Sequence, residues 1–200
     1  GKGLGGGLLP ISAALTRREI HQRAYGSMAK FDLHGSTYGG NALSCITALE
    51  TLAIIDDDKL CDRAETLGQR LRLGLAERVG DHPFVQEIRG AGLMVAIVLG
   101  PTGKGLLQKL LAPAVAAVTK QVLGQWLSVR LLEVGFLAQP ATQQWNILKL
   151  TPPLTITAEQ IDAAVAAIGD VLDAYTSLAP LAADVTKRLG SQLLNKGAFG

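Results

Sequence analysis

Two lysines and a pair of neighbouring hydroxyl groups are the residues of this sequence whose settings suggest chemistry. Lys2 stands in the run Gly1-Lys2-Gly3-Leu4-Gly5-Gly6-Gly7. Glycine lets the backbone take positive φ and lets a ligand or another chain come close. A lysine amine shielded in such a place favours its uncharged, nucleophilic form, which condenses with aldehydes to Schiff bases. Taken alone, however, a lysine near a chain end is usually a solvated charge.

The hydroxyl pair is Ser36 and Thr37, inside the polar stretch His34-Gly35-Ser36-Thr37-Tyr38-Gly39-Gly40-Asn41. Adjacent hydroxyls, glycine-supported amides and a helix that starts at Asn41 together suit a phosphate group. An ordinary turn followed by a helix cap would show the same pattern, so the stretch does not decide between the two.

The second lysine is Lys149, which precedes Thr151-Pro152-Pro153 at the end of an expected strand. A cation fixed on a rigid element suits an anionic group of a ligand. A surface lysine on a strand is an equally open interpretation.

These residues need a scaffold, and the hydrophobic spacing predicts one of mixed type. Apolar runs indicate strands, and apolar residues at helical spacing with capping residues before them indicate helices. The predicted strands are 8–15, 85–88, 93–99, 136–138 and 146–150, and the predicted helices are 16–25, 41–55, one from residue 57 or 58, 106–133 and 157–175. A turn is expected at Arg89-Gly90-Ala91-Gly92, breaks in the fourth helix at Pro113 and Gly124, and a last amphipathic helix in the tail. This order is typical of an α/β or α+β arrangement.

Composition narrows the class of protein further. Hydrophobic residues make up 48% of the chain, and 19 basic residues nearly balance 17 acidic ones, with no basic cluster of the kind that nucleic acids require. No apolar run is long enough for a membrane span. Neither the histidines nor Cys45 and Cys61 have metal-ligand spacing, and two unpatterned cysteines fit a reducing, cytoplasmic setting. The missing initiator methionine leads us to expect a fragment of a longer protein.

Four stretches, in this order, strongly resemble the class III aminotransferases of the ornithine, acetylornithine and putrescine type. They are Gly1–Ala13, His34–Leu43, Arg89–Met94 and Leu150–Thr157. Each is weak alone, but the order and spacing extend over about residues 1–175.

This resemblance implies the fold type I of pyridoxal-phosphate-dependent transferases, here as a C-terminal fragment of α/β class. The expected division is the end of the large cofactor-binding domain at 1–55, a small α+β domain with its connecting helix at 56–176, and a tail at 177–200.

The resemblance also implies roles for single residues. Lys2 matches the catalytic lysine that holds pyridoxal phosphate as a Schiff base and moves the substrate proton. Thr37, with Ser36 beside it, matches the threonine that reaches across a homodimer interface to the cofactor phosphate of the other subunit. Arg89 matches an arginine of the turn into the small domain, for which we expect a structural role. No metal is implied.

Two departures from the family bear on the substrate. Lys149 stands where many members carry an arginine that grips the α-carboxylate, and lysine lacks the bidentate fork. This leaves ω-amines, diamines and ornithine-like amino acids open as donors to a 2-oxo acid. The family's N-terminal half, which supplies the aspartate for the pyridine nitrogen, is absent from the sequence, so we expect this chain alone to be inactive. An aminomutase on the same fold, or an inactive isolated fragment, is the alternative.

Overall fold

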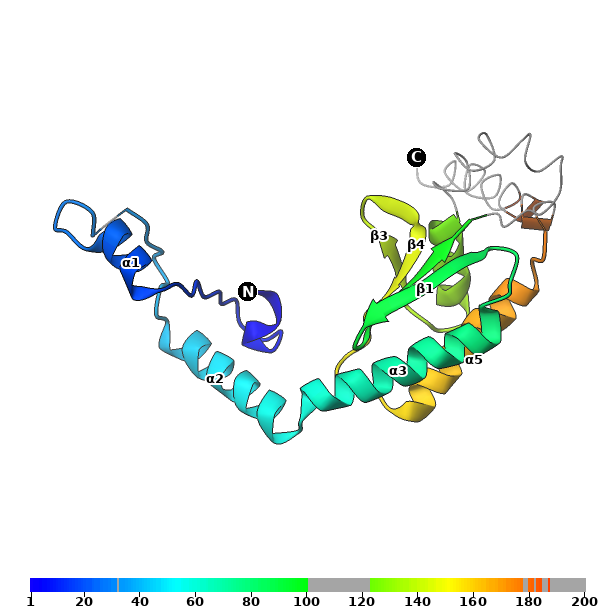
Figure 1. Cartoon of the computed structure of the whole chain (residues 1–200), viewed down its shortest axis with the longest axis horizontal. Coiled ribbons are helices and arrows are strands. Elements are labelled where there is room, and N and C mark those ends of the chain that lie inside the picture. The colour runs from blue at the N-terminus through cyan, green and yellow to red at the C-terminus, as the bar shows by residue number, and fades with distance from the viewer. Residues whose placement is uncertain (32, 101–122, 178–179, 182, 185–186, 188–200) are drawn as a thin grey trace, which may run out of the picture. The chain divides into compact units, whose positions relative to one another are not determined.

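The computed structural model describes residues 1–31, 33–100, 123–177, 180–181, 183–184 and 187 (Figure 1). The chain divides into two compact units, Gly1–Cys61 and Asp62–Gly200. Each unit is described by itself. The boundary at Cys61 differs from the expected domain boundary at residue 55, and the expected division into 1–55, 56–176 and 177–200 stays a prediction.

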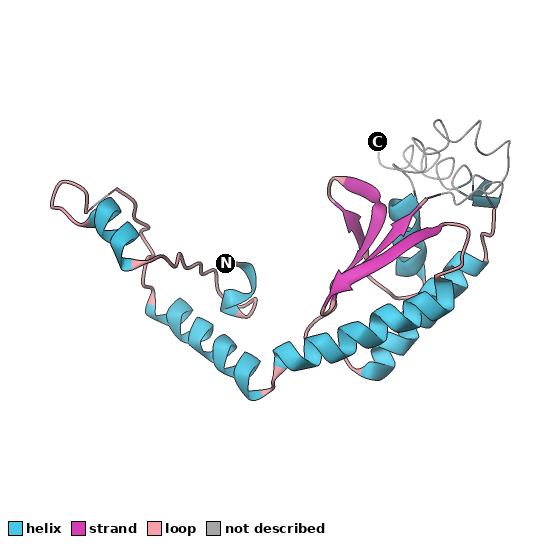
Figure 2. Cartoon of the chain, viewed as in Figure 1, coloured by secondary structure: helices cyan, strands magenta, loops and turns pink. Residues whose placement is uncertain are grey.

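The first unit is helical in its described part (Figure 2). It contains the short 3₁₀ helix η1 (Lys2–Gly5) and the helices α1 (Arg18–Tyr25) and α2 (Ala42–Asp57). The helix predicted from Asn41 is confirmed, because the Asn41 side chain accepts a hydrogen bond from the Ser44 amide at 3.1 Å. Such a cap satisfies one of the amides that a helix start leaves unpaired.

The strand predicted over 8–15 is wrong. These residues form no regular element, and the side chains of Leu8 and Leu15 are 79% and 92% exposed. An apolar run becomes a strand only beside a partner strand, and the described part of this unit contains none. The predicted cap at Thr16 is also wrong, since α1 begins after Arg17 without a side-chain cap.

The second unit packs helices against one antiparallel sheet. Its elements are α3 (Leu60–Val79), β1 (Val85–Ala91), β2 (Met94–Leu99), a helix over 123–133, β3 (Gln139–Ala141), β4 (Gln144–Leu150) and α5 (Ala158–Asp173). The sheet order is β1-β2-β4-β3. Although Leu60 and Cys61 begin α3, the rest of that helix lies in this unit.

Three details of the prediction change. The turn expected at 89–92 is narrower, because Arg89 to Ala91 belong to β1. The strand expected at 136–138 lies at 139–141, and Gly124 is part of a helix instead of a break. Residues 106–122 of the predicted helix 106–133, with Pro113, and most of the predicted tail helix lie outside the described residues.

The hydrophobic core lies on one face of this sheet. Alternate residues of the two central strands point to that face, as the pleat requires, and they meet the inner faces of α3, α5 and the helix over 123–133. The core includes Val95, Ile97, Leu99, Leu148, Leu75, Leu127, Leu131, Ile161 and Leu172. No helix in the described part of the chain is long and apolar enough to cross a membrane.

Arginines of α3 tie it to α5, and the two helices run parallel, side by side in Figure 1. Arg70 binds Asp162 through two hydrogen bonds, at 2.8 and 2.6 Å. Two turns on, Arg78 binds Asp170 at 2.9 Å and Asp173 at 2.6 Å. The hydrogen bonds from Arg70 and Arg78 lower the pKa of the Asp162 and Asp173 carboxyls. Because the arginines of α3 and their aspartate partners on α5 have the same spacing along the chain, these ion pairs fix the register of the two helices.

Gly68 lets the β1–β2 turn approach the inner face of α3. A Cβ atom at Gly68 would collide with the carbonyl oxygen of Gly92, whose own φ of 50° defines that turn. Arg72, one turn further along α3, donates to the same carbonyl at 3.2 Å. The hairpin therefore rests directly on the helix backbone.

We predict that Gly68→Ala destabilises the second unit by about 2 kcal/mol, because the backbone must move to admit the methyl group. This loss outweighs the roughly 1 kcal/mol that alanine gains in a helix. Gly74→Ala, on the same helix, is the control, since its Cβ would meet only Val165 Cγ2 at 3.3 Å. Urea unfolding of both variants measures the difference, and equal stabilities would contradict the contact.

His82 links the start of β1 to the end of α5. Its Nδ1 accepts from the Phe84 amide at 3.2 Å, so Nε2 carries the proton and donates to the Leu172 carbonyl at 3.0 Å. Burial lowers the pKa of the imidazole. A proton on Nδ1 would break the hydrogen bond from the Phe84 amide. Folding therefore favours the neutral form of the His82 imidazole.

Stability is therefore predicted to decline as the pH falls below about 6.5, where the unfolded chain takes up the His82 proton first. Denaturant midpoints measured from pH 8 to pH 5 test this. His82→Gln should flatten the decline, and an unchanged slope in that variant would assign it to other groups.

Candidate active site

Lys2 occupies a strained backbone position. Its φ is 58°, one of two positive values among the described non-glycine residues. The left-handed region is costly for a residue with a Cβ atom, and such strain persists only where the surroundings impose it. Here Gly6, with φ 61°, closes the turn by donating to the Gly3 carbonyl at 3.0 Å. The Lys2 side chain is exposed.

Helix α2 supports this turn from within the same unit. A Cβ at Gly6 would lie 3.0 Å from Thr51 Oγ1, and one at Gly5 would lie 3.2 Å from Ile11 Cγ2. Gly5 is buried. The glycines thus serve close packing, but the shielded amine expected from the sequence is not found, because the Lys2 side chain is exposed in the described structure.

Ser36 and Thr37 lie in the loop before α2. The Gly39 amide donates to the Ser36 carbonyl at 2.9 Å, and the Asn41 amide donates to the Tyr38 carbonyl at 3.1 Å. These two turns bring the chain to the helix N-terminus, whose partial positive charge favours anions. Both side chains are exposed, and no hydrogen bond in the described part of the chain engages either hydroxyl.

The structure brings Ser36 and Thr37 together in one loop, and it places Lys2 in the same unit. No hydrogen bond between the described residues of that unit joins the lysine to the hydroxyls. The exposed Lys2 amine is a group that condenses with aldehydes, and the exposed hydroxyls before the N-terminus of α2 are groups that bind phosphate. The described residues do not join the two into one hydrogen-bonded site.

Lys149 belongs to the other unit and borders a cleft of about 560 Å³. The cleft lies at the β3–β4 edge of the sheet, beside α5. Its described lining is mostly apolar, and Lys149 is the only charged residue in it. The polar residues of the lining are Gln139, Lys149, Thr151 and Gln160.

The loop that leaves Lys149 is held by Arg63 of α3. The Arg63 guanidinium donates to the carbonyls of Leu154 at 3.3 Å and Ile156 at 2.6 Å, and more weakly to that of Thr155 at 3.5 Å. At the far end of the loop, Thr157 and Gln160 form the predicted capping box of α5. Arg63 could not be recognised from the sequence, because its partners lie about ninety residues away and are backbone atoms.

The α/β framework, the strained lysine among glycines and the hydroxyl loop before a helix agree with the fold type I of pyridoxal-phosphate-dependent transferases, the fold that the solved structures below share. The class-III aminotransferase family model matches residues 1–172. The chain belongs to this family, whose members are enzymes that depend on pyridoxal phosphate.

Curated relatives support the assignment. The ornithine aminotransferase of Emericella nidulans is 35% identical over 161 residues, which are 80% of this chain and 30% of the relative. The acetylornithine aminotransferase of Mycobacterium leprae is 34% identical over 173 residues, 86% of this chain and 35% of the relative. The chain thus spans about a third of the length of such relatives.

Solved structures share the fold. The acetylornithine aminotransferase of Elizabethkingia anophelis gives a TM-score of 0.70 at 32% identity, over 87% of this chain and 39% of that one. The ornithine aminotransferase of Toxoplasma gondii gives 0.67 at 31% identity, over 86% and 35%, in a structure with partial occupancy of pyridoxal phosphate at the active site.

We predict that Arg63→Ala speeds amide hydrogen exchange of residues 154–157, because the loop loses the group that binds its carbonyls. Gln69→Ala is the control, an exposed residue on the same helix for which no side-chain hydrogen bond is found in the described structure. Exchange followed by NMR should separate the variants. If both left the loop amides unchanged, Arg63 would not be what holds the loop.

Proposed function

We propose that these residues form part of an aminotransferase that moves an amino group from an amine or amino acid to a 2-oxo acid. An ω-amine, a diamine or an ornithine-like amino acid is the proposed donor class. The observation that carries the proposal is the accessible Lys2 amine on a strained glycine turn, in a chain of the class III family.

Pyridoxal phosphate, when bound, supplies an aldehyde that condenses with amines and a ring that withdraws electrons from the substrate. We assign to Lys2 Nζ the covalent attachment of that aldehyde. When that attachment is released, the same nitrogen would be free to act as the base that accepts the proton of the substrate Cα and later gives it up. Close glycine packing fixes the backbone of the turn from which this side chain extends.

Ser36 and Thr37 are proposed to hold the cofactor phosphate. Their hydroxyls donate hydrogen bonds, and the N-terminus of α2 adds a favourable partial charge. We further propose that the protein works as a homodimer in which Thr37 serves the site of the other subunit. The relation to the family's lysine and threonine supports this, together with the exposure of both hydroxyls.

Lys149 is proposed to bind a substrate carboxylate. Its side chain lies on the face of β4 that is turned away from the core, at a sheet edge that also borders the cleft. An ammonium makes single, undirected ion pairs where a guanidinium makes two parallel ones. A site with lysine alone therefore discriminates less between amino acids and diamines.

Turnover is proposed to need more of the family's length than this chain contains. Helix α2 exposes large apolar side chains, and the described part of the first unit has few buried apolar residues. The exposed apolar residues of α2 are Leu43, Ile46, Leu49, Leu52 and Ile54. A helix that is apolar on all sides is normally buried in a larger domain. We propose that the further length found in the relatives covers this helix and supplies the remaining cofactor contacts.

A reducing, cytoplasmic setting is proposed as well. Both cysteines, Cys45 and Cys61, are free thiols, and Cys61 is exposed. Disulfides are common in oxidising compartments and rare in the cytosol.

We predict that pyridoxal phosphate attaches to Lys2 in preference to the other lysines. The chain is incubated with stoichiometric pyridoxal phosphate, the bond is fixed by borohydride reduction, and the labelled lysine is located by mass spectrometry. Lys59→Arg, which removes the other described lysine at positive φ, is the control and should leave the label on Lys2.

Lys2→Arg should abolish that label and leave the far-ultraviolet circular dichroism unchanged. Labelling spread evenly over the lysines, with or without the complementary part of a family member, would contradict the role of Lys2.

A further inference from the structure

One row of residues crosses the sheet on the side opposite the core. Arg89 of β1 pairs with Ala96 of β2, Ala96 pairs with Lys149 of β4, and Lys149 pairs with Gln139 of β3. Successive side chains on a strand point to opposite faces. The neighbours of this row along the strands, Ile88, Val95, Ile97, Leu148 and Leu150, pack in or against the core. The four residues of the row therefore share the other face.

Within the row, two cations flank a small residue. Adjacent strands lie about 4.8 Å apart, so the Cα atoms of Arg89 and Lys149 are about 10 Å apart. Only the methyl group of Ala96 stands between them. Both side chains are long enough for their charged ends to meet above that methyl around one shared anion.

A carboxylate already lies beside the Arg89 guanidinium. Glu87, two residues earlier on the same face of β1, binds Arg89 Nη1 at 3.2 Å. The two side chains are 54% and 51% exposed. Exposed ion pairs contribute little to stability, so a carboxylate from solution can replace Glu87 at small cost.

We propose that Arg89 and Lys149 form one carboxylate site and that Glu87 competes within the protein for Arg89. This inference rests on the proposed function, because the carboxylate bound at this site is taken to be that of the 2-oxo acid or amino acid substrate. Arg89 supplies the guanidinium fork that Lys149 lacks. Its role is then specificity, in place of the purely structural role expected from the sequence.

The site is tested on the 200-residue chain without pyridoxal phosphate. The ¹⁵N-labelled chain is titrated with butyrate at constant ionic strength, and with butyramide as the uncharged match. Butyrate should shift the Arg89 Nε–H signal and the backbone amides of Ala96 and Lys149. Butyramide should leave them in place.

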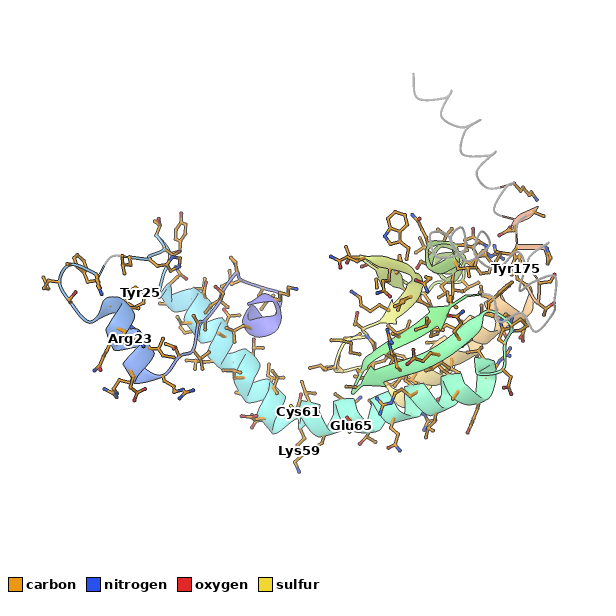
Figure 3. The ribbon with its side chains drawn as sticks, turned by 45° about the horizontal axis from the view of Figure 1, so that its top comes forward. Arg23, Tyr25, Lys59, Cys61, Glu65 and Tyr175 are labelled. Carbon is orange, nitrogen blue, oxygen red and sulfur yellow. The ribbon has the colours of Figure 1, made fainter. Side chains whose placement is uncertain are left out.

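Substitutions then separate the members of the site. Arg89→Gln and Lys149→Gln should each weaken butyrate binding by about threefold or more, and Glu87→Gln should tighten it by about threefold, as expected for exposed ion pairs. Arg23→Gln removes the same charge from α1, in the other unit (Figure 3), and should change nothing.

Three results would overturn the proposal. They are butyrate affinity unaffected by Arg89→Gln, an equal loss with Arg23→Gln, or weaker binding with Glu87→Gln. None of them bears on Lys2, because the measurement contains no cofactor. Conversely, if Lys2 were not labelled, carboxylate binding at Arg89 and Lys149 would still stand. Only the claim that the bound carboxylate is part of a substrate would be lost.

Discussion

The second unit depends on the parallel packing of α3 and α5. Arg63, Arg70 and Arg78 recur at two-turn spacing along α3, and each reaches a partner roughly ninety residues further on. Arg63 binds backbone carbonyls, whereas Arg70 and Arg78 bind carboxylates. The close contact of Gly169 with the Arg78 side chain also lies between these helices. This register sets the position of the sheet edge, and with it the cleft at which Lys149 lies.

Local signals were readable from the sequence wherever the interaction itself is local. The caps at Asn41 and Thr157, the strand 146–150 and the family stretches around Lys2 and Thr37 all involve residues a few positions apart. Features that depend on distant partners were not readable. The run 8–15 has the composition of a strand but no partner strand in the described part of its unit, and Arg63 meets carbonyls that carry no side-chain signature. The row through Arg89 and Lys149 required the strand order and register.

The two units differ in how much of their apolar surface is buried. The second has a continuous core that joins the sheet to its helices. In the first, α2 exposes large apolar side chains, while its glycine contacts hold Lys2 in an otherwise unfavourable conformation. A strained lysine on a unit with little core agrees with the proposal that this unit belongs to a larger domain.

The most direct test of amino transfer is a single half-reaction in a full-length family protein that carries these residues. Its absorbance spectrum is recorded with pyridoxal phosphate and an ornithine-like donor, without any 2-oxo acid. An aminotransferase leaves all of the cofactor in the amino form, and a 2-oxo acid then restores the aldehyde form. A spectrum that returns to the aldehyde form without a 2-oxo acid, while the donor isomerises, would contradict the account and indicate an aminomutase.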